Sequence, residues 1–274
     1  MLAFALRGVM SIWSDTFKHT QHRPYPLPDR AWTMHMSWQE LLFAHWPFSA
    51  ETVRARIAAT FGDLPAGLEI DTFEGSCYLG VVPFRMARTG LRFWPTMLGP
   101  HTFPELNVRT YVRYKDASTG LSAGRPGVLF FSLDAASRLA VFTARRWFYL
   151  PYFKARMSID AGESIQYRSV RTHGGAPAAE FEARYGAAGP VYSSQQGTLE
   201  RWLTERYCLY SIGPRQSLWR GEIHHELWPL QPATAEISLN TMAASHGFAL
   251  PDVKPILHYV KNVDVVAWAP ERVK

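Results

Sequence analysis

The sequence feature that most constrains the fold is the segment 127–157, GVLFFSLDAASRLAVFTARRWFYLPYFKARM. Residues 128–133 form a short apolar run after a Pro-Gly pair, a pattern typical of a buried strand. Asp134 comes next and is predicted to cap a helix by accepting a backbone N–H at the helix start. Residues 135–147 are nearly all apolar or alanine apart from three arginines. A helix that is apolar on most sides is predicted to lie in the core.

The end of this segment carries the first sign of a functional site. Arg145 and Arg146 close the predicted buried helix, and they need partners because an unpaired buried charge costs several kcal/mol. Pro151 then breaks the helical pattern. Tyr152 and Lys154 are therefore predicted to lie on a loop pinned by that proline.

The rest of the chain reads mainly as short strands. Residues 107–114 (NVRTYVRY) alternate in the way of a strand, and residues 164–170 and 178–185 are predicted to form a hairpin. Residues 50–61 are predicted to be a helix, since Ser49 supplies an N-cap and a glycine follows. Many short strands and few helices favour an α+β fold that is mainly antiparallel: a barrel or curved sheet with a few packed helices.

One domain accounts for most of the chain. Residues 1–30 contain three closely spaced prolines and are predicted to be an N-terminal extension that lies over the body of the protein. Residues 31–274 contain no convincing linker and are predicted to be a single domain. Which face of the strand 107–114 looks inward is left open at this stage.

Composition excludes several classes of function. Cys77 and Cys208 are the two cysteines and lie far apart, which argues against a zinc site or a disulfide framework and favours a reducing cytoplasm. The net charge of +6 and the pI near 9.4 come without a basic tail, so they favour small anions over nucleic acid as partners. No apolar run approaches the ~20 residues that a membrane span needs, so no membrane association is predicted.

Motifs for the common cofactors are missing. Neither a dinucleotide fingerprint nor a phosphate loop occurs, so no cofactor is predicted. His224, His225 and Glu226 invite a metal site, but Pro229 stands where a zinc-binding H-E-x-x-H motif needs its second histidine. Adjacent histidines on a strand point to opposite faces, and no metal is predicted.

Several phrases together carry a family resemblance: LLFAHWPF, EIDTFEG, YLGVVPFRM, FPELNVRTYV, GVLFFSLDA, ARRWFYLPY and GTLERWLTERYCLY. They resemble the YqjF-like family of uncharacterised bacterial proteins, over about residues 30–268. That family is in turn distantly similar to acetoacetate decarboxylase. The resemblance implies that enzyme's fold, a cone-shaped antiparallel β-barrel with the active site inside.

The decarboxylase likeness also implies positions for a site. Decarboxylases of that family carry two adjacent lysines after a proline, and one of them forms a Schiff base with the keto substrate. Alignment on Arg145 and Pro151 puts this lysine pair on Tyr152 and Phe153, and puts the active-site glutamate on Glu105. Both lysines are thus absent from their positions. The resemblance implies a scaffold that is kept and a nucleophile that is lost.

We therefore expect a polar cluster inside the barrel. In this interpretation Arg109 and Arg145 bind a carboxylate, Glu105 handles a proton and Tyr152 donates a hydrogen bond. The predicted function is binding of a small organic anion, a carboxylate or an oxo acid. Whether the protein is an enzyme stays open, and one alternative is a Schiff-base or lyase/hydratase-type enzyme acting on oxo acids through Lys154.

The second alternative is a non-catalytic structural role in a homo-oligomer, with aromatic residues at the subunit interface. Internally paired arginines would favour the structural alternative. Guanidinium groups without partners around a pocket would favour ligand binding.

Overall fold

The fold is that of a computed structural model, which describes residues 13, 15–92, 102–115 and 124–273. Most of these residues lie in strands. The strands are β1 (Met34–Phe48), β2 (Leu68–Ile70), β3 (Cys77–Leu91), β4 (Phe103–Tyr114), β5 (Arg125–Ala135), β6 (Tyr152–Ala161), β7 (Ile165–Arg171), β8 (Glu180–Ala187), β9 (Cys208–Gly213), β10 (Ser217–His225), β11 (Gln231–Asn240), β12 (Ile256–Ala267) and β13 (Glu271–Arg272).

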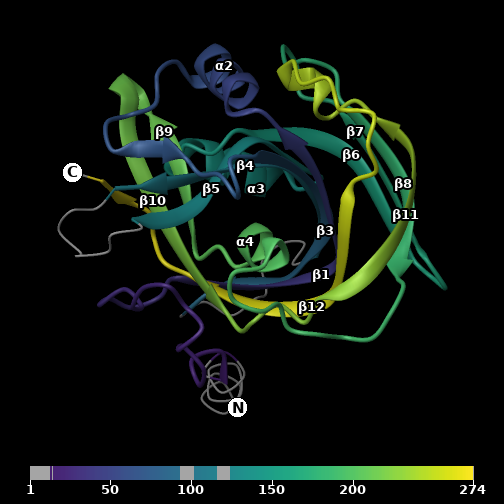
Figure 1. Cartoon of the computed structure of the whole chain (residues 1–274), viewed down its shortest axis with the longest axis horizontal. Coiled ribbons are helices and arrows are strands. Elements are labelled where there is room, and N and C mark those ends of the chain that lie inside the picture. The colour runs from purple at the N-terminus through teal and green to yellow at the C-terminus, as the bar shows by residue number, and fades with distance from the viewer. Residues whose placement is uncertain (1–12, 14, 93–101, 116–123, 274) are drawn as a thin grey trace.

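Strand pairing closes the sheet on itself twice, as the curved strands of Figure 1 show. The larger ring runs β5–β6–β7–β8–β11–β12–β1–β3–β4 and returns to β5. The smaller ring leaves β5 through β9 and β10, and it rejoins the shared strands at β12. The pairs β5–β6 and β5–β9 are parallel, and the other pairings are antiparallel. The predicted architecture, mainly antiparallel with a few helices, is confirmed.

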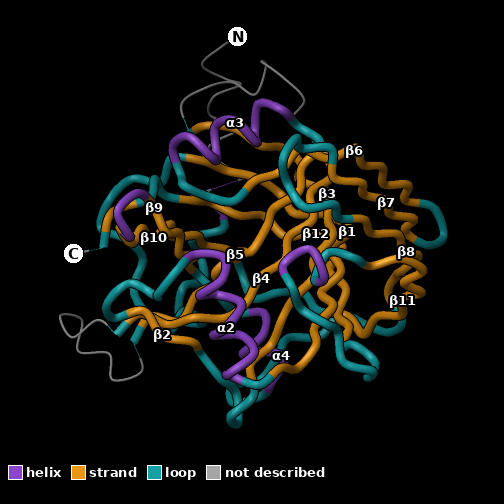
Figure 2. The backbone as a smooth tube through the Cα atoms, turned by 90° about the horizontal axis from the view of Figure 1, so that it is seen from above, coloured by secondary structure: helices purple, strands orange, loops and turns teal. Residues whose placement is uncertain are grey.

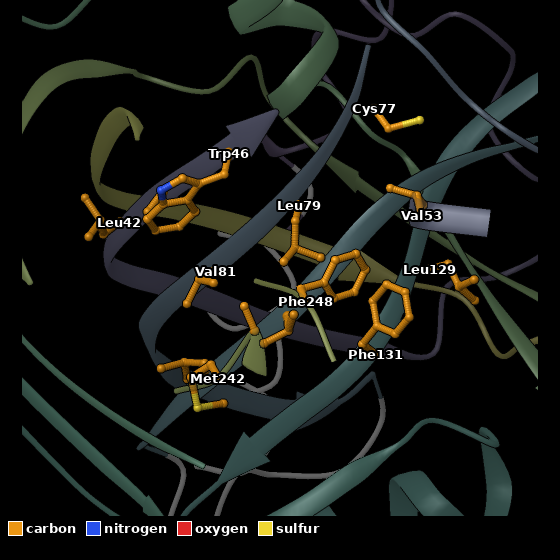
Figure 3. Close-up of a cluster of buried hydrophobic side chains, with 14 of the residues drawn as sticks. Leu42, Trp46, Val53, Cys77, Leu79, Val81, Leu129, Phe131, Met242 and Phe248 are labelled. Carbon is orange, nitrogen blue, oxygen red and sulfur yellow. The ribbon is translucent and has the colours of Figure 1, made fainter. Parts of the chain in front are cut away.

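Strands shared by the two rings are buried on both faces. Residues 105–112 of β4 are all buried, so both faces of this strand look inward. Side chains of one face contribute to the core that Figure 3 shows, which includes Leu79, Phe131 and Phe248. Those of the other face join a second core around Phe43 and Trp228.

The helices close the ends of this sheet. The helix α2 (Ala50–Phe61) begins at Ser49, whose side chain accepts from the Thr52 N–H, and it ends at Gly62, as its end signals predict. A second helix, α4 (Leu199–Thr204), lies inside the smaller ring in Figure 1. The third, α3 (Arg138–Trp147), lies at the opposite end of the molecule from α4 (Figure 2).

The predictions for the start and burial of α3 are wrong. Strand β5 continues through Asp134 to Ala135, so Asp134 is not the cap; Ser137 is, accepting from the Ala140 N–H at 3.3 Å. The helix also exposes a large part of its surface: Leu139 and Phe142 are each 63% exposed. It is amphipathic and covers the sheet with one side only. The prediction of a loop after Pro151 is wrong as well, because the chain enters β6 at Tyr152.

The described part of the N-terminal extension packs closely on the body. Trp13 contacts Val266 and Trp268, and the Arg23 guanidinium lies 3.5 Å from the Glu222 carboxylate on β10. The domain boundaries stay a prediction. Within the described residues, none of the helices has the length and apolar character that crossing a membrane requires.

Candidate functional site

The site is built by a strand–helix–strand unit, β5–α3–β6. Leu133 and Ala135 on β5 pair in parallel with Tyr152 and Lys154 on β6. Parallel neighbours need a crossover connection, and α3 provides it. The crossover lays α3 beside the beginning of β6, so the helix arginines and the first residues of β6 come together.

A buried carboxyl lies beneath this unit. Glu105 on β4 is 2% exposed, and Oε2 of its carboxyl accepts a hydrogen bond from the Tyr152 hydroxyl at 3.0 Å. No lysine or arginine of the described chain forms an ion pair with it. Burial raises the pKa of Glu105 to about 8, against a smaller lowering by the Tyr152 hydrogen bond. The carboxyl therefore keeps its proton near neutral pH and is able to exchange it there.

Tyr152 links this carboxyl to the surface. Its hydroxyl binds Glu105, while its backbone carbonyl accepts from Nη1 of Arg145 at 2.8 Å. Burial raises the pKa of Tyr152 well above its ordinary value, so the hydroxyl stays a donor. Tyr152 thus connects a buried, protonated carboxyl group with an arginine on the protein surface.

A buried ion pair lies on the other side of β6. Arg171 at the end of β7 donates to both oxygens of Asp134, at 2.7 and 2.9 Å, and neither side chain is more than 1% exposed. The Arg171 guanidinium also lies 4.3 Å from the ring centre of Phe153. This pair explains the burial of Asp134. Sequence reasoning missed it because the two residues are 37 positions apart.

An open groove of about 660 Å³ runs between α3, the start of β6 and the turn that follows β7. Four of its lining residues are cations, and no aspartate or glutamate of the described chain lines it. The lining consists of Arg138, Val141, Phe142, Arg145, Arg146, Lys154, Thr172, His173 and Gly174.

Two contacts hold the cationic wall in place. Arg145 is fixed by its hydrogen bond to the Tyr152 carbonyl, and its guanidinium lies 5.6 Å from the ring centre of Phe153. The backbone N–H of Lys154 donates to Nδ1 of His173 at 3.2 Å. Burial, with the nearby charge of Arg145, lowers the pKa of His173. A neutral His173 with Nδ1 occupied carries its proton on Nε2 and is a donor there.

The predicted residues divide into two groups. Glu105, Tyr152, Arg145 and Lys154 gather around the β5–α3–β6 unit, although Arg145 is an exposed groove residue and not an interior one. Arg109 does not join them. It is 9% exposed on the smaller ring's core, 5.1 Å from the Phe43 ring centre, and its Nε and Nη2 have no hydrogen-bond partner in the described structure.

Among the groove residues outside the predicted site, three carry ionisable side chains: Arg138, Arg146 and His173. The spacing of Arg138, Phe142 and Arg145 places them on one helix face, and that signal was available in the sequence. No sequence pattern near His173 predicts its contact with Lys154, because this contact depends on the pairing of β6 with β7.

The histidine pair on β10 has a packing role. His224 binds the Thr16 carbonyl at 2.7 Å, whereas His225 stacks on Tyr207, 4.7 Å between ring centres. Across the part of the chain that the structure describes, no group of three or more His, Cys, Asp or Glu residues is arranged to hold a metal ion.

Known proteins match this chain over nearly its whole length. A family model of uncharacterised conserved proteins, DUF2071, matches residues 35–264. The uncharacterised protein YqjF of Bacillus subtilis (strain 168) is 41% identical over 249 residues, which are 90% of this chain and 96% of that protein. The predicted YqjF-like resemblance is confirmed.

Solved structures share the fold at low identity. Acetoacetate decarboxylase of Legionella pneumophila aligns with a TM-score of 0.56 and 13% identity, covering 96% of this chain and 95% of that one. The enduracididine biosynthesis enzyme MppR, solved in complex with pyruvate, aligns with a TM-score of 0.57 and 12% identity, covering 92% of each chain. These matches confirm the acetoacetate-decarboxylase-like fold.

Proposed function

The chain belongs to the DUF2071 family of uncharacterised conserved proteins, and we propose that it binds a small organic anion, a carboxylate or an oxo acid, in the groove between α3 and β6. One observation carries the proposal. Four arginine and lysine side chains line a groove of about 660 Å³ that has no acidic lining residue in the described structure. Surface cations are ordinarily interspersed with acids, and a cationic cleft raises the local concentration of anions.

The wall of the groove supports this role because it is partly organised before any ligand arrives. Arg145 already has one N–H committed to the Tyr152 carbonyl, which fixes the plane of the guanidinium and leaves other N–H groups for a ligand. A planar fork of donors matches a carboxylate. Less conformational entropy is then lost on binding.

Calorimetric titration with pyruvate and acetoacetate tests the proposal. Wild-type protein is expected to bind at least one of them, and Arg145→Gln is expected to weaken binding by about tenfold. Arg168→Gln is the matched control, since Arg168 is an exposed arginine on β7 outside the groove and its loss removes the same charge. Equal affinities in wild type and Arg145→Gln, or no heat with either acid, would contradict the proposal.

Schiff-base chemistry is a second candidate, and the position of Lys154 in the same groove favours it. In that reaction the amine nitrogen attacks the ketone carbon of an oxo acid, and water leaves as the C=N bond forms. Borohydride then delivers a hydride to the C=N bond and fixes the adduct as a secondary amine. Peptide mass spectrometry after such trapping with acetoacetate decides between the candidates: an adduct on Lys154, lost in Lys154→Arg, establishes that Lys154 forms a Schiff base, and its absence leaves binding alone.

A further inference from the structure

The groove has more positive charge than one carboxylate can balance. Arg138, Arg145 and Arg146 come from α3, and Lys154 comes from β6. A monoanion balances one of these four charges. The remaining three would face each other without an acid among the described lining residues.

An apolar element lies on the same wall. Phe142 lies between Arg138 and Arg145 in the sequence and lines the groove with them, and the residue is 63% exposed. Leu139, one helical turn away, is equally exposed. Exposed large apolar side chains at helical neighbours of arginines provide a surface for the apolar part of a ligand whose charged end meets the guanidinium groups.

We infer that the ligand of this groove is a phosphate monoester attached to an apolar group. This inference rests on the anion binding of the proposed function, and it names a phosphate instead of a carboxylate as the charged group that the groove prefers. A phosphate monoester carries close to two negative charges at neutral pH, and its three terminal oxygens accept from several guanidinium groups at once. The Nε2–H of neutral His173 adds a further donor at the same wall.

Two sources supply this chemistry, a soluble organophosphate and a phospholipid headgroup. The groove is open, and Leu139 and Phe142 both face outward from α3, so the geometry accepts either source. The shared features are the phosphate and the adjoining apolar group. The experiment separates the sources.

The test compares ligands that share an apolar body and differ in their charge. Phenyl phosphate and benzoate are titrated into the full chain at one salt concentration. Phenyl phosphate is expected to bind at least about tenfold more tightly than benzoate, because it engages more of the guanidinium groups. Phe142→Ala is expected to weaken phenyl phosphate binding, whereas Leu91→Ala, which removes another exposed side chain far along β3, leaves it unchanged.

A second arm uses vesicles of phosphatidylcholine, with and without phosphatidic acid, in a flotation assay. Flotation only with phosphatidic acid, lost in Phe142→Ser and in Arg145→Gln, assigns the site to a lipid headgroup. Tight binding of phenyl phosphate without flotation assigns it to a soluble ester. Equal affinity for benzoate and phenyl phosphate, without flotation, overturns this inference and leaves the proposed function standing. No binding of any anion in either arm overturns both.

Discussion

Two arginines contact the ring of Phe153, and their surroundings are opposite. Arg171 lies 4.3 Å from the ring centre, is buried, and shares both oxygens of the buried Asp134. Arg145 lies 5.6 Å from the ring centre, is exposed, and has a backbone carbonyl as its hydrogen-bond acceptor. The first arginine is satisfied by the protein. The second arginine keeps N–H donors that a ligand in the groove can use.

This contrast separates charges that are paired within the fold from charges that are exposed on the groove. A buried charge must be paired within the protein because desolvation costs several kcal/mol. Glu222 with Arg23 and Asp71 with Arg206 follow the same rule elsewhere in the core. Charges on an open groove are solvated, so a cluster of one sign is tolerated and is available to a ligand.

The largest effect is expected from breaking the buried side. Arg171→Met should destabilise the protein by about 3–5 kcal/mol, because it leaves the Asp134 carboxylate buried without a partner. Arg145→Met, on the other side of the same ring, should change the free energy of unfolding by less than about 0.5 kcal/mol. Denaturant unfolding of both variants measures the difference, and similar losses would erase the distinction.

Arg109 sharpens the comparison, since it is buried without a carboxylate partner among the described residues. Arg109→Met strands no acid and removes a buried guanidinium that has no carboxylate partner. The relieved desolvation should offset the lost contact with the Phe43 ring, which is worth about 1 kcal/mol, so the free energy of unfolding should change little or rise. A loss as large as that of Arg171→Met would show that Arg109 is held by the fold in a way its contacts do not reveal.

The buried Glu105 predicts a pH dependence of stability that is smaller than the loss expected for Arg171→Met. Its pKa is about 8 in the folded protein and near 4.5 in the unfolded chain, so between these values the folded state binds more protons and stability falls as pH rises. Glu105→Gln removes this loss. The variant should gain about 2–3 kcal/mol relative to wild type between pH 5 and pH 7, at about 1.4 kcal/mol per pH unit.

The comparison of the two proteins isolates Glu105 from other titrating groups. Burial lowers the pKa of His224 to about 4 and that of His225 to about 3, so both make the protein less stable as the pH falls below about 6.5. They do so alike in wild type and variant. A stability difference that stays flat from pH 5 to pH 7 would mean that Glu105 is ionised in the folded protein.

Tyr152→Phe tests whether the interior and the groove act independently. Loss of the hydroxyl should destabilise the protein by about 1–2 kcal/mol and raise the pKa of Glu105 further, because the lost hydrogen bond lowers that pKa. Arg145 donates to the backbone carbonyl of residue 152, which the variant keeps. Anion affinity should therefore stay within about twofold of wild type; a larger loss would show that the groove depends on the carboxyl beneath it.

Local signals in the sequence predicted the elements that depend on neighbours along the chain. Ser49 and the glycine after residue 61 mark both ends of α2, because caps act within one helical turn. The alternation of residues 107–114 marks β4, and the family resemblance supplied the fold. The closure of two rings on shared strands depends on pairings between distant segments, and no local pattern encodes it.

The errors around α3 have the same origin. Asp134 and Ser137 are both suitable caps, and the choice between them was made by β4, whose Glu105 pairs with Ala135 and extends β5 past the aspartate. Apolar content predicted a buried helix, but content does not tell which face meets the sheet. The gathering of Glu105, Tyr152 and Arg145 was predictable from the alignment, whereas Arg109 was expected there and lies elsewhere.

The smallest expected effect distinguishes two adjacent arginines within the groove. Arg145 is held by the Tyr152 carbonyl and lies over Phe153, whereas no hydrogen bond holds Arg146 to the described residues. A held guanidinium loses less rotamer entropy when a ligand binds, and a lysine cannot reproduce its planar fork. Arg145→Lys should weaken binding of pyruvate or phenyl phosphate by about fivefold, and Arg146→Lys by about twofold or less. Equal losses in the two variants would mean that the groove attracts anions by its charge alone, and that the contact with Tyr152 adds no direction to it.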